Sequence, residues 1–87
     1  MGGFPGKGGQ VKALVELLAR SLVDHPEAVV VQEMDGPHAT VVELRVSPED
    51  LGKVIGRGGR VIKAIRILAR AAATRSGKRV TVEIVRP

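Results

Sequence analysis

The chain has 87 residues and no cysteine, so we expect one domain with neither a disulfide framework nor a thiolate metal site. It carries 14 Lys and Arg against 9 Asp and Glu, a formal net charge of +5, which favours a polyanionic partner. It shows neither an apolar run of the roughly 20 residues that a membrane span needs nor a signal-peptide pattern at its N-terminus, so a soluble, cytoplasmic protein without a membrane partner is expected.

The N-terminal residues 1–9 are rich in Gly and Pro and are predicted to form a flexible tail, which leaves 10–87 as the folded domain. After the tail, apolar residues recur with the spacing of one face of an amphipathic helix: Val11, Leu14, Val15, Leu18 and Leu22. Pro26 is expected to end this helix, because the residue before a proline avoids the helical region.

The next two segments have the composition of strands. Residues 28–34 are rich in β-branched side chains. Residues 40–46 alternate, and one face consists of Thr40, Val42, Leu44 and Val46. The sequence Asp-Gly-Pro-His between the two segments is typical of a turn, so they predict an antiparallel hairpin.

A short helix is predicted after the hairpin, since the sequence Ser-Pro-Glu-Asp at 47–50 is typical of a helix start. Ser47 would be its N-cap and Pro48 its first residue, and the two acidic residues would interact with the helix dipole. Three apolar residues of this helix are expected to point inward: Leu51, Val54 and Ile55.

The second half of the chain also predicts a longer helix and a final strand. The helix at 60–75 is expected to bury Val61, Ile65, Leu68 and Ala72 and to end at Gly77. Residues 79–85 alternate as a strand. The order α-β-β-α-α-β predicts an α+β domain with a three-stranded sheet packed on one face by three helices.

The loop between these two helices consists of Gly56, Arg57, Gly58 and Gly59. Three glycines are expected where the backbone needs positive φ angles or where a ligand approaches it closely. The loop leads into a helix N-terminus, where unpaired N–H groups and the helix dipole favour an anion. Arg57 and Arg60 flank this point, and Lys53 precedes the loop by one turn, so the loop predicts a phosphate site.

A stripe of cations continues from the loop along the longer helix: Arg60, Lys63, Arg66 and Arg70. A solvated helix face is the commoner explanation of a basic stripe taken alone. Its position next to the glycine loop favours contact with a nucleic acid.

The segment VIGRGGRVI at 54–62 resembles the signature of the KH domain, (Val/Ile)-Ile-Gly-x-x-Gly-x-x-Ile, and the order of elements is similar to the type II, prokaryotic form. The resemblance to the small stand-alone bacterial members of this family covers about residues 11–86. It implies single-stranded RNA binding, with the loop on the sugar-phosphate backbone. Gly58 departs from the usual pattern as an added glycine, which is expected to make the loop more flexible.

The resemblance also implies roles for individual residues. Val54, Ile55 and Ile62 would form an apolar floor against the bases. The complete set of predicted RNA-binding residues is Lys53, Val54, Ile55, Gly56, Arg57, Gly58, Gly59, Arg60, Ile62, Lys63, Arg66 and Arg70. Phe4 is the only aromatic residue, so base stacking is not available to this groove, and weak, salt-sensitive binding is expected. The predicted role is that of an RNA chaperone or post-transcriptional regulator.

An enzyme is not expected. His25 and His38 lie beside turn residues, and the sequence places neither a nucleophile nor an orienting carboxylate next to them. Asp24 and His25 would form only a lone metal-ligating pair, and no nucleotide-cofactor motif is present. We therefore expect no catalytic residue, metal, cofactor or small-molecule substrate.

The alternative function is a protein-interaction module. Ala64, Ile67 and Ala71 lie at the edge of the basic stripe, and a wide apolar core face is the explanation that we favour for them. They could instead contact a second KH domain, in a homodimer or in a heterodimer with a larger KH-containing partner. Single-stranded DNA also stays open as a ligand, because no residue is identified that reads the 2′-hydroxyl group.

A near copy of the loop, GKGG at 6–9, precedes the first helix. It has no helix before it, and the helix after it carries Glu16 where the second copy has Arg66. We therefore interpret this first copy as part of the tail.

Overall fold

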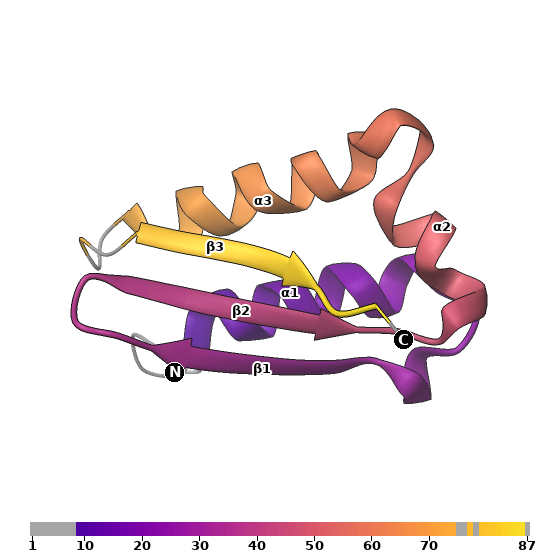
Figure 1. The fold of residues 1–87 in the computed structure, drawn as a ribbon, viewed down its shortest axis with the longest axis horizontal. Coiled ribbons are helices and arrows are strands. Elements are labelled where there is room, and N and C mark those ends of the chain that lie inside the picture. Colours follow the sequence, from indigo (N-terminus) through magenta and orange to yellow (C-terminus); the bar gives the residue numbers. More distant parts are fainter. Residues whose placement is uncertain (1–8, 75–76, 78, 87) are drawn as a thin grey trace, which may run out of the picture.

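The computed structural model describes residues 9–74, 77 and 79–86 and confirms the predicted order of elements (Figure 1). Short 3-10 turns accompany the helices and strands. The elements are α1 (Gly9–Leu22), a turn at Pro26–Ala28, β1 (Val30–Asp35), β2 (Ala39–Arg45), a turn at Pro48–Asp50, α2 (Leu51–Ile55), a turn at Arg57–Gly59, α3 (Arg60–Ala72) and β3 (Arg79–Ile84). The predicted tail and its GKGG sequence lie outside the described residues, apart from Gly9, with which α1 begins.

The three strands form one mixed sheet in the order β1-β2-β3. β1 and β2 form the predicted antiparallel hairpin, which pairs Val30 with Arg45 and Asp35 with Thr40. β3 pairs with β2 in parallel, so the chain between them crosses over through α2 and α3. β1 and β3 are consequently the two edges of this sheet.

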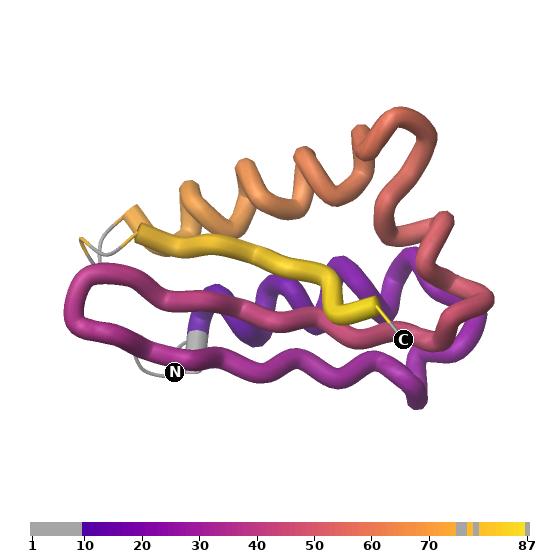
Figure 2. The backbone as a smooth tube through the Cα atoms, viewed as in Figure 1, coloured from indigo at the N-terminus to yellow at the C-terminus, as the bar shows by residue number. Residues whose placement is uncertain are grey.

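The helices cover one face of the sheet, as the sequence predicted (Figures 1 and 2). α1 packs against β1 and β2, α3 packs against β3 and α1, and α2 packs against α3 at one end of the molecule. On β2, alternate side chains enter the core, as predicted: Thr40, Val42 and Leu44. On α1, Val11 and Val15 are buried, but Leu22 is exposed because it is the last residue of the helix.

The predicted inner face of α3 is partly wrong. Within α3 the buried residues are Ile62, Ile65 and Ala69. Of the other predicted positions, Val61 and Ala72 are partly buried and Leu68 is 46% exposed. Both rows of apolar residues fit a helical period, so the period alone does not identify the inner one. The packing of α3 against β3 and α1 decides between them. The helix ends at Ala72, and the predicted end at residue 75 lies outside the described part of the chain.

The start of α2 also differs from the prediction. The chain first makes the 3-10 turn Pro48–Asp50, and the α-helix begins only at Leu51. Ser47 occupies the N-cap position, but its side chain makes no capping hydrogen bond. Asp50 is completely buried and does not lie in an exposed first turn.

Candidate nucleic-acid interface

The loop between α2 and α3 depends on backbone conformations that favour glycine. The φ angles are 77° at Gly56, 64° at Gly58 and 78° at Gly59, while Arg57 has an ordinary negative φ. A Cβ atom at Gly56 would lie 2.4 Å from Val61 Cγ2, so close packing excludes a side chain there as well. A Cβ atom at Gly58 would meet nothing within 4 Å, so the surface of the loop is open at that point.

The loop offers fewer free amides than its sequence suggests. Gly59 N donates to Gly56 O at 3.1 Å, and Arg60 N donates to Arg57 O. The N–H groups of Gly59 and Arg60 are thus used within this 3-10 turn and are not free for an anion at the start of α3. Arg57 and Gly58 are the exposed residues of the loop, so a ligand can approach it from their side.

Lys53 does not face the loop as a free cation. Its Nζ lies 3.1 Å from Asp24 Oδ2 and 3.4 Å from Asp50 Oδ1. The hydrogen bond and the charge of Asp24 raise the pKa of Lys53 above its ordinary value, and Asp50 adds to this effect while desolvation opposes it. The ammonium group of Lys53 is thus paired with two carboxylates. The sequence had instead suggested that Lys53 is a cation of the phosphate site.

Two of the three residues predicted as an apolar floor belong to the core instead. Val54 has no exposed surface, and Ile62 is only 6% exposed, because both pack into the cluster between the helices and the sheet. In this conformation Val54 offers no surface to a ligand and Ile62 offers little. Ile55 is only partly buried, so it is the member of the three with surface available to a ligand.

The predicted basic stripe lies on the solvent side of α3. Arg60, Lys63 and Arg70 are exposed. A shallow cleft of about 260 Å³ is lined by Lys63, Arg66, Ile67 and Arg70. Arg66 is half-buried, and its Nε donates to Val82 O at 3.1 Å, which satisfies a carbonyl of the edge strand β3. The stripe therefore connects the glycine loop to the open edge of the sheet.

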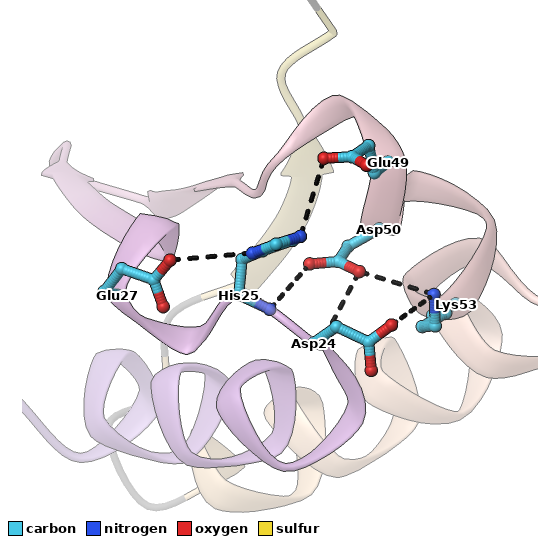
Figure 3. A network of polar contacts seen from close by, with 6 residues as sticks. All are labelled: Asp24, His25, Glu27, Glu49, Asp50 and Lys53. Atoms are coloured by element: carbon cyan, nitrogen blue, oxygen red, sulfur yellow. Dashed lines mark hydrogen bonds and ion pairs between the residues drawn. The ribbon is translucent and has the colours of Figure 1, made fainter.

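A buried carboxylate that sequence reasoning missed lies at the start of α2 (Figure 3). Asp50 Oδ1 accepts a hydrogen bond from Asp24 N at 3.2 Å, and Oδ2 accepts one from His25 N at 3.0 Å. Burial raises the pKa of Asp50, but these amides and Lys53 outweigh it, so that the pKa lies below its ordinary value. Asp50 and Val54 are four residues apart on one helical face, and this spacing was the available signal for its burial.

His25 extends this polar cluster toward two glutamates. Its Nδ1 lies 3.6 Å from Glu27 Oε2, and its Nε2 lies 3.5 Å from Glu49 Oε1 (Figure 3). Among the residues that the structure describes, no group of three or more His, Cys, Asp or Glu side chains could hold a metal ion. The polar contacts of His25, Asp50 and Lys53 connect the segment after α1 to the segment before α2.

The apolar residues beside the basic stripe are not part of the core. Ile67 is 64% exposed and Leu68 46% exposed, and Ala64 and Ala71 are exposed as well. The explanation favoured from the sequence, a wide core face, is therefore wrong for these positions. On the neighbouring helix α1, Leu17 is 63% exposed.

None of the helices among the described residues has the length and hydropathy that a membrane span requires.

Comparison with known proteins gives matches over most of the chain. The family model for the KH domain of KhpA and KhpB matches residues 12–84. Two proteins named RNA-binding protein KhpA, from Clostridium perfringens and Clostridium acetobutylicum, are 55% and 52% identical over 75 residues, which is 86% of this chain and 100% of each relative. The protein of the same name from Aquifex aeolicus is 47% identical over 75 residues, 86% of this chain and 95% of the relative.

Solved structures show the same fold at low sequence identity. A crystal structure of Era in complex with MgGDPNP and nucleotides 1506–1542 of 16S ribosomal RNA aligns with a TM-score of 0.60 and 20% identity. The alignment covers 86% of this chain and 30% of the Era chain. A second Era structure, from Aquifex aeolicus and bound to GDP.AlF4-, has a TM-score of 0.59 and 21% identity over the same shares of the two chains.

Proposed function

This chain belongs to the KH-domain family of KhpA and KhpB, and from this premise we propose that it binds single-stranded RNA through its glycine loop and the basic face of α3. The family is not enzymatic, and its full-length relatives are named RNA-binding proteins. The biological role that we propose is that of a cytoplasmic RNA chaperone or post-transcriptional regulator.

One observation carries this proposal: the exposed loop and the exposed cations form one continuous surface. Arg57 and Gly58 are the exposed part of the loop, and Arg60, Lys63 and Arg70 follow along α3. The open space at Gly58 lets a sugar-phosphate backbone approach the main chain closely, and the arginines can donate to phosphate oxygens. RNA would therefore bind to this surface without any movement of the core residues.

The physical chemistry of this surface predicts how RNA is held. Phosphate contacts by Lys and Arg make affinity fall as salt concentration rises. Base stacking on an aromatic ring contributes about 1–3 kcal/mol per base where it occurs, but no aromatic side chain is present among the described residues. The bases would instead meet partly buried apolar surface such as Ile55. Binding by one domain is therefore weak and dominated by the RNA backbone.

The loop is tested by the double variant Arg57→Asp with Gly58→Asp. Both positions are exposed, and Asp tolerates the left-handed conformation better than most residues, so the fold should persist. The two carboxylates would repel phosphate, and we expect RNA affinity to fall at least about a hundredfold, or roughly 3 kcal/mol. Fluorescence anisotropy with a labelled single-stranded RNA of mixed sequence measures the change.

A matched control separates the loop from net charge. Lys12→Glu with Ala13→Glu makes the same change in charge at exposed positions in the first turn of α1. The N-terminal end of α1 lies away from α2 (Figure 1). This control should lose much less affinity than the loop variant. Equal losses in the two variants, or an intact affinity in the loop variant, would show that the loop is not the site.

The exposed apolar residues of α3 favour a second candidate function, contact with another KH domain. Ile67 is 64% exposed yet lies in the same cleft as Lys63, Arg66 and Arg70. A surface of this kind is often covered by a protein partner. A homodimer or a heterodimer through this face would cover part of the basic stripe, so RNA and the partner would compete for it.

A further inference from the structure

The position of the glycine loop depends on a helix that is too short to be stable alone. α2 has five residues, Leu51–Ile55, and the loop follows directly after it. Isolated helices shorter than about 12 residues are marginal in water, so α2 must be held by the rest of the molecule. Val54 holds one side of it in the core. The polar cluster at its start, which includes Asp50 and Lys53, also attaches it to the rest of the molecule.

Asp50 connects the start of α2 to a distant part of the chain. Each oxygen of its buried carboxylate accepts a hydrogen bond from the backbone N–H of a consecutive residue, Asp24 at 3.2 Å and His25 at 3.0 Å (Figure 3). These two residues lie after the end of α1 and before β1. One side chain therefore fixes the start of α2 relative to the connection between two elements of the core, and it uses two backbone donors to do so.

Lys53 adds a second attachment, one turn closer to the loop. Its Nζ reaches Asp24 Oδ2 at 3.1 Å as well as Asp50 Oδ1 at 3.4 Å. Gly56, which begins the loop, donates its N–H to Gly52 O at 2.8 Å, so the loop starts directly from the turn that Lys53 and Asp50 anchor. A change in the direction of α2 would be transmitted to Arg57 and Gly58.

We infer that Asp50 is the positioning residue of the RNA-binding loop: through the backbone amides of residues 24 and 25 and through Lys53, it fixes the direction in which α2 presents Gly56–Gly59. The inference rests on the proposed function, because it assigns Asp50 no contact with RNA. In this arrangement Lys53 acts within the cluster, and its charge is directed at Asp24 and Asp50 instead of at a phosphate.

The variant Asp50→Asn tests this role. The amide group keeps the size of the side chain but places an NH₂ donor against one of the two backbone N–H groups, and it removes the charge that faces Lys53. If the loop then holds its binding arrangement for about one fifth of the time, the apparent Kd for RNA rises about fivefold. The measurement is anisotropy with a labelled single-stranded RNA of mixed sequence, at a temperature where circular dichroism shows full folding.

Hydrogen exchange distinguishes positioning from a general loss of stability. In Asp50→Asn, the amides of residues 56–60 should exchange faster than in the parent protein, while those of β2 keep their rates under native conditions. The control is Val31→Ala, a core change on the edge strand β1 that lowers stability without altering the cluster. The RNA affinity of Val31→Ala should equal that of the parent. The exchange rate of its loop amides, divided by that of its strand amides, should also equal the parent ratio.

Lys53→Met keeps the inference testable if Asp50→Asn fails to fold. The Lys53 side chain is 45% exposed, so its replacement should be tolerated, and both amide hydrogen bonds to Asp50 remain. We expect a smaller rise in Kd, about twofold, with the slope of log K against log salt unchanged. A slope that falls by about one would show a direct phosphate contact by Lys53 and overturn its role in the cluster.

Failure of the inference and failure of the proposed function give different results. If the variant with Arg57→Asp and Gly58→Asp loses RNA binding while Asp50→Asn retains the parent Kd and loop exchange, the loop is the site but Asp50 does not position it. If the loop variant binds RNA like the parent, the proposed function itself is wrong.

Discussion

Gly52 and Gly56 lie four residues apart, yet a side chain would fit at Gly52 and would not fit at Gly56. A Cβ atom at Gly52 would meet nothing within 4 Å, whereas one at Gly56 would lie 2.4 Å from Val61 Cγ2 and 2.9 Å from Val61 N. Gly56 also has φ 77° and ψ 168°, a region that is almost confined to glycine. At the scale of single residues, therefore, the first loop glycine is fixed by packing and backbone conformation, independently of any ligand.

Alanine at these two positions should change stability in opposite directions. Gly56→Ala should lower the free energy of unfolding by about 3 kcal/mol, through backbone strain and the contact with Val61. Gly52→Ala should raise it by about 0.5–1 kcal/mol, because alanine favours the helix and fits without contact. Urea unfolding followed by circular dichroism measures both. A Gly56→Ala protein as stable as the parent would contradict the described loop conformation.

At the scale of elements, the polar cluster makes the attachment of α2 sensitive to acid. The pKa of Asp50 is lowered in the folded protein, so its contribution to stability is present above the ordinary value of 3.8 and is lost as the pH falls through the folded-state pKa. The ionisable groups around it are Asp24, Lys53, His25 and Glu49. The pKa of Lys53 is raised, so its contribution is lost only as the pH rises through a value above 10.5.

We therefore expect the parent protein to lose more stability than Asp50→Asn on acidification from about pH 6 to about pH 2. The measurement is the urea midpoint of both proteins across this range. Because the other carboxylates titrate in both proteins, the difference between the two curves of urea midpoint against pH measures the contribution of Asp50 to stability. Parallel curves would mean that the folded-state pKa of Asp50 is not lowered.

The elements also show what pattern reasoning can and cannot predict. β2 was predicted correctly because its alternation allows only one buried face. The inner face of α3 was not, because apolar residues occupy two rows of that helix and only packing selects Ile62, Ile65 and Ala69. Asp50 was interpreted only as one of two acidic residues that interact with the helix dipole, and its burial was not predicted. Its partners are backbone amides of residues 24 and 25, which no side-chain pattern reveals.

At the scale of the whole molecule, the basic stripe and the exposed apolar residues lie on the same helix, α3, directly after the glycine loop. The predicted cations Arg57, Arg60, Lys63 and Arg70 are exposed, but Lys53 is paired and Val54 is buried, so fewer of the predicted site residues are open to a ligand than the sequence suggested. Ile67 and Leu68 lie beside the basic stripe and are 64% and 46% exposed. A partner bound over them would reach the basic cleft.

If a second copy of the chain occupies this apolar surface, Ile67→Glu should shift the protein toward the monomer. Burial of an unpaired carboxylate at a contact is costly, so dimer affinity should fall at least about tenfold. Sedimentation velocity over a range of protein concentrations measures this, with Leu17→Glu on α1 as a control at an equally exposed leucine. An unchanged association in Ile67→Glu would place any dimer contact elsewhere, and a protein that is monomeric throughout would exclude the homodimer.

The parallel pairing of β3 with β2 has a consequence for the order in which the domain is completed during synthesis. The loop and both of its helices leave the ribosome before β3, the strand on which α3 packs and to which Arg66 is bonded through Val82 O. Non-local strand pairs form late, because the chain between them must first be closed. Until β3 inserts beside β2, α3 lacks the strand on which it packs in the finished domain. A nascent chain therefore carries the whole GRGG sequence before the strand that supports α3 is in place.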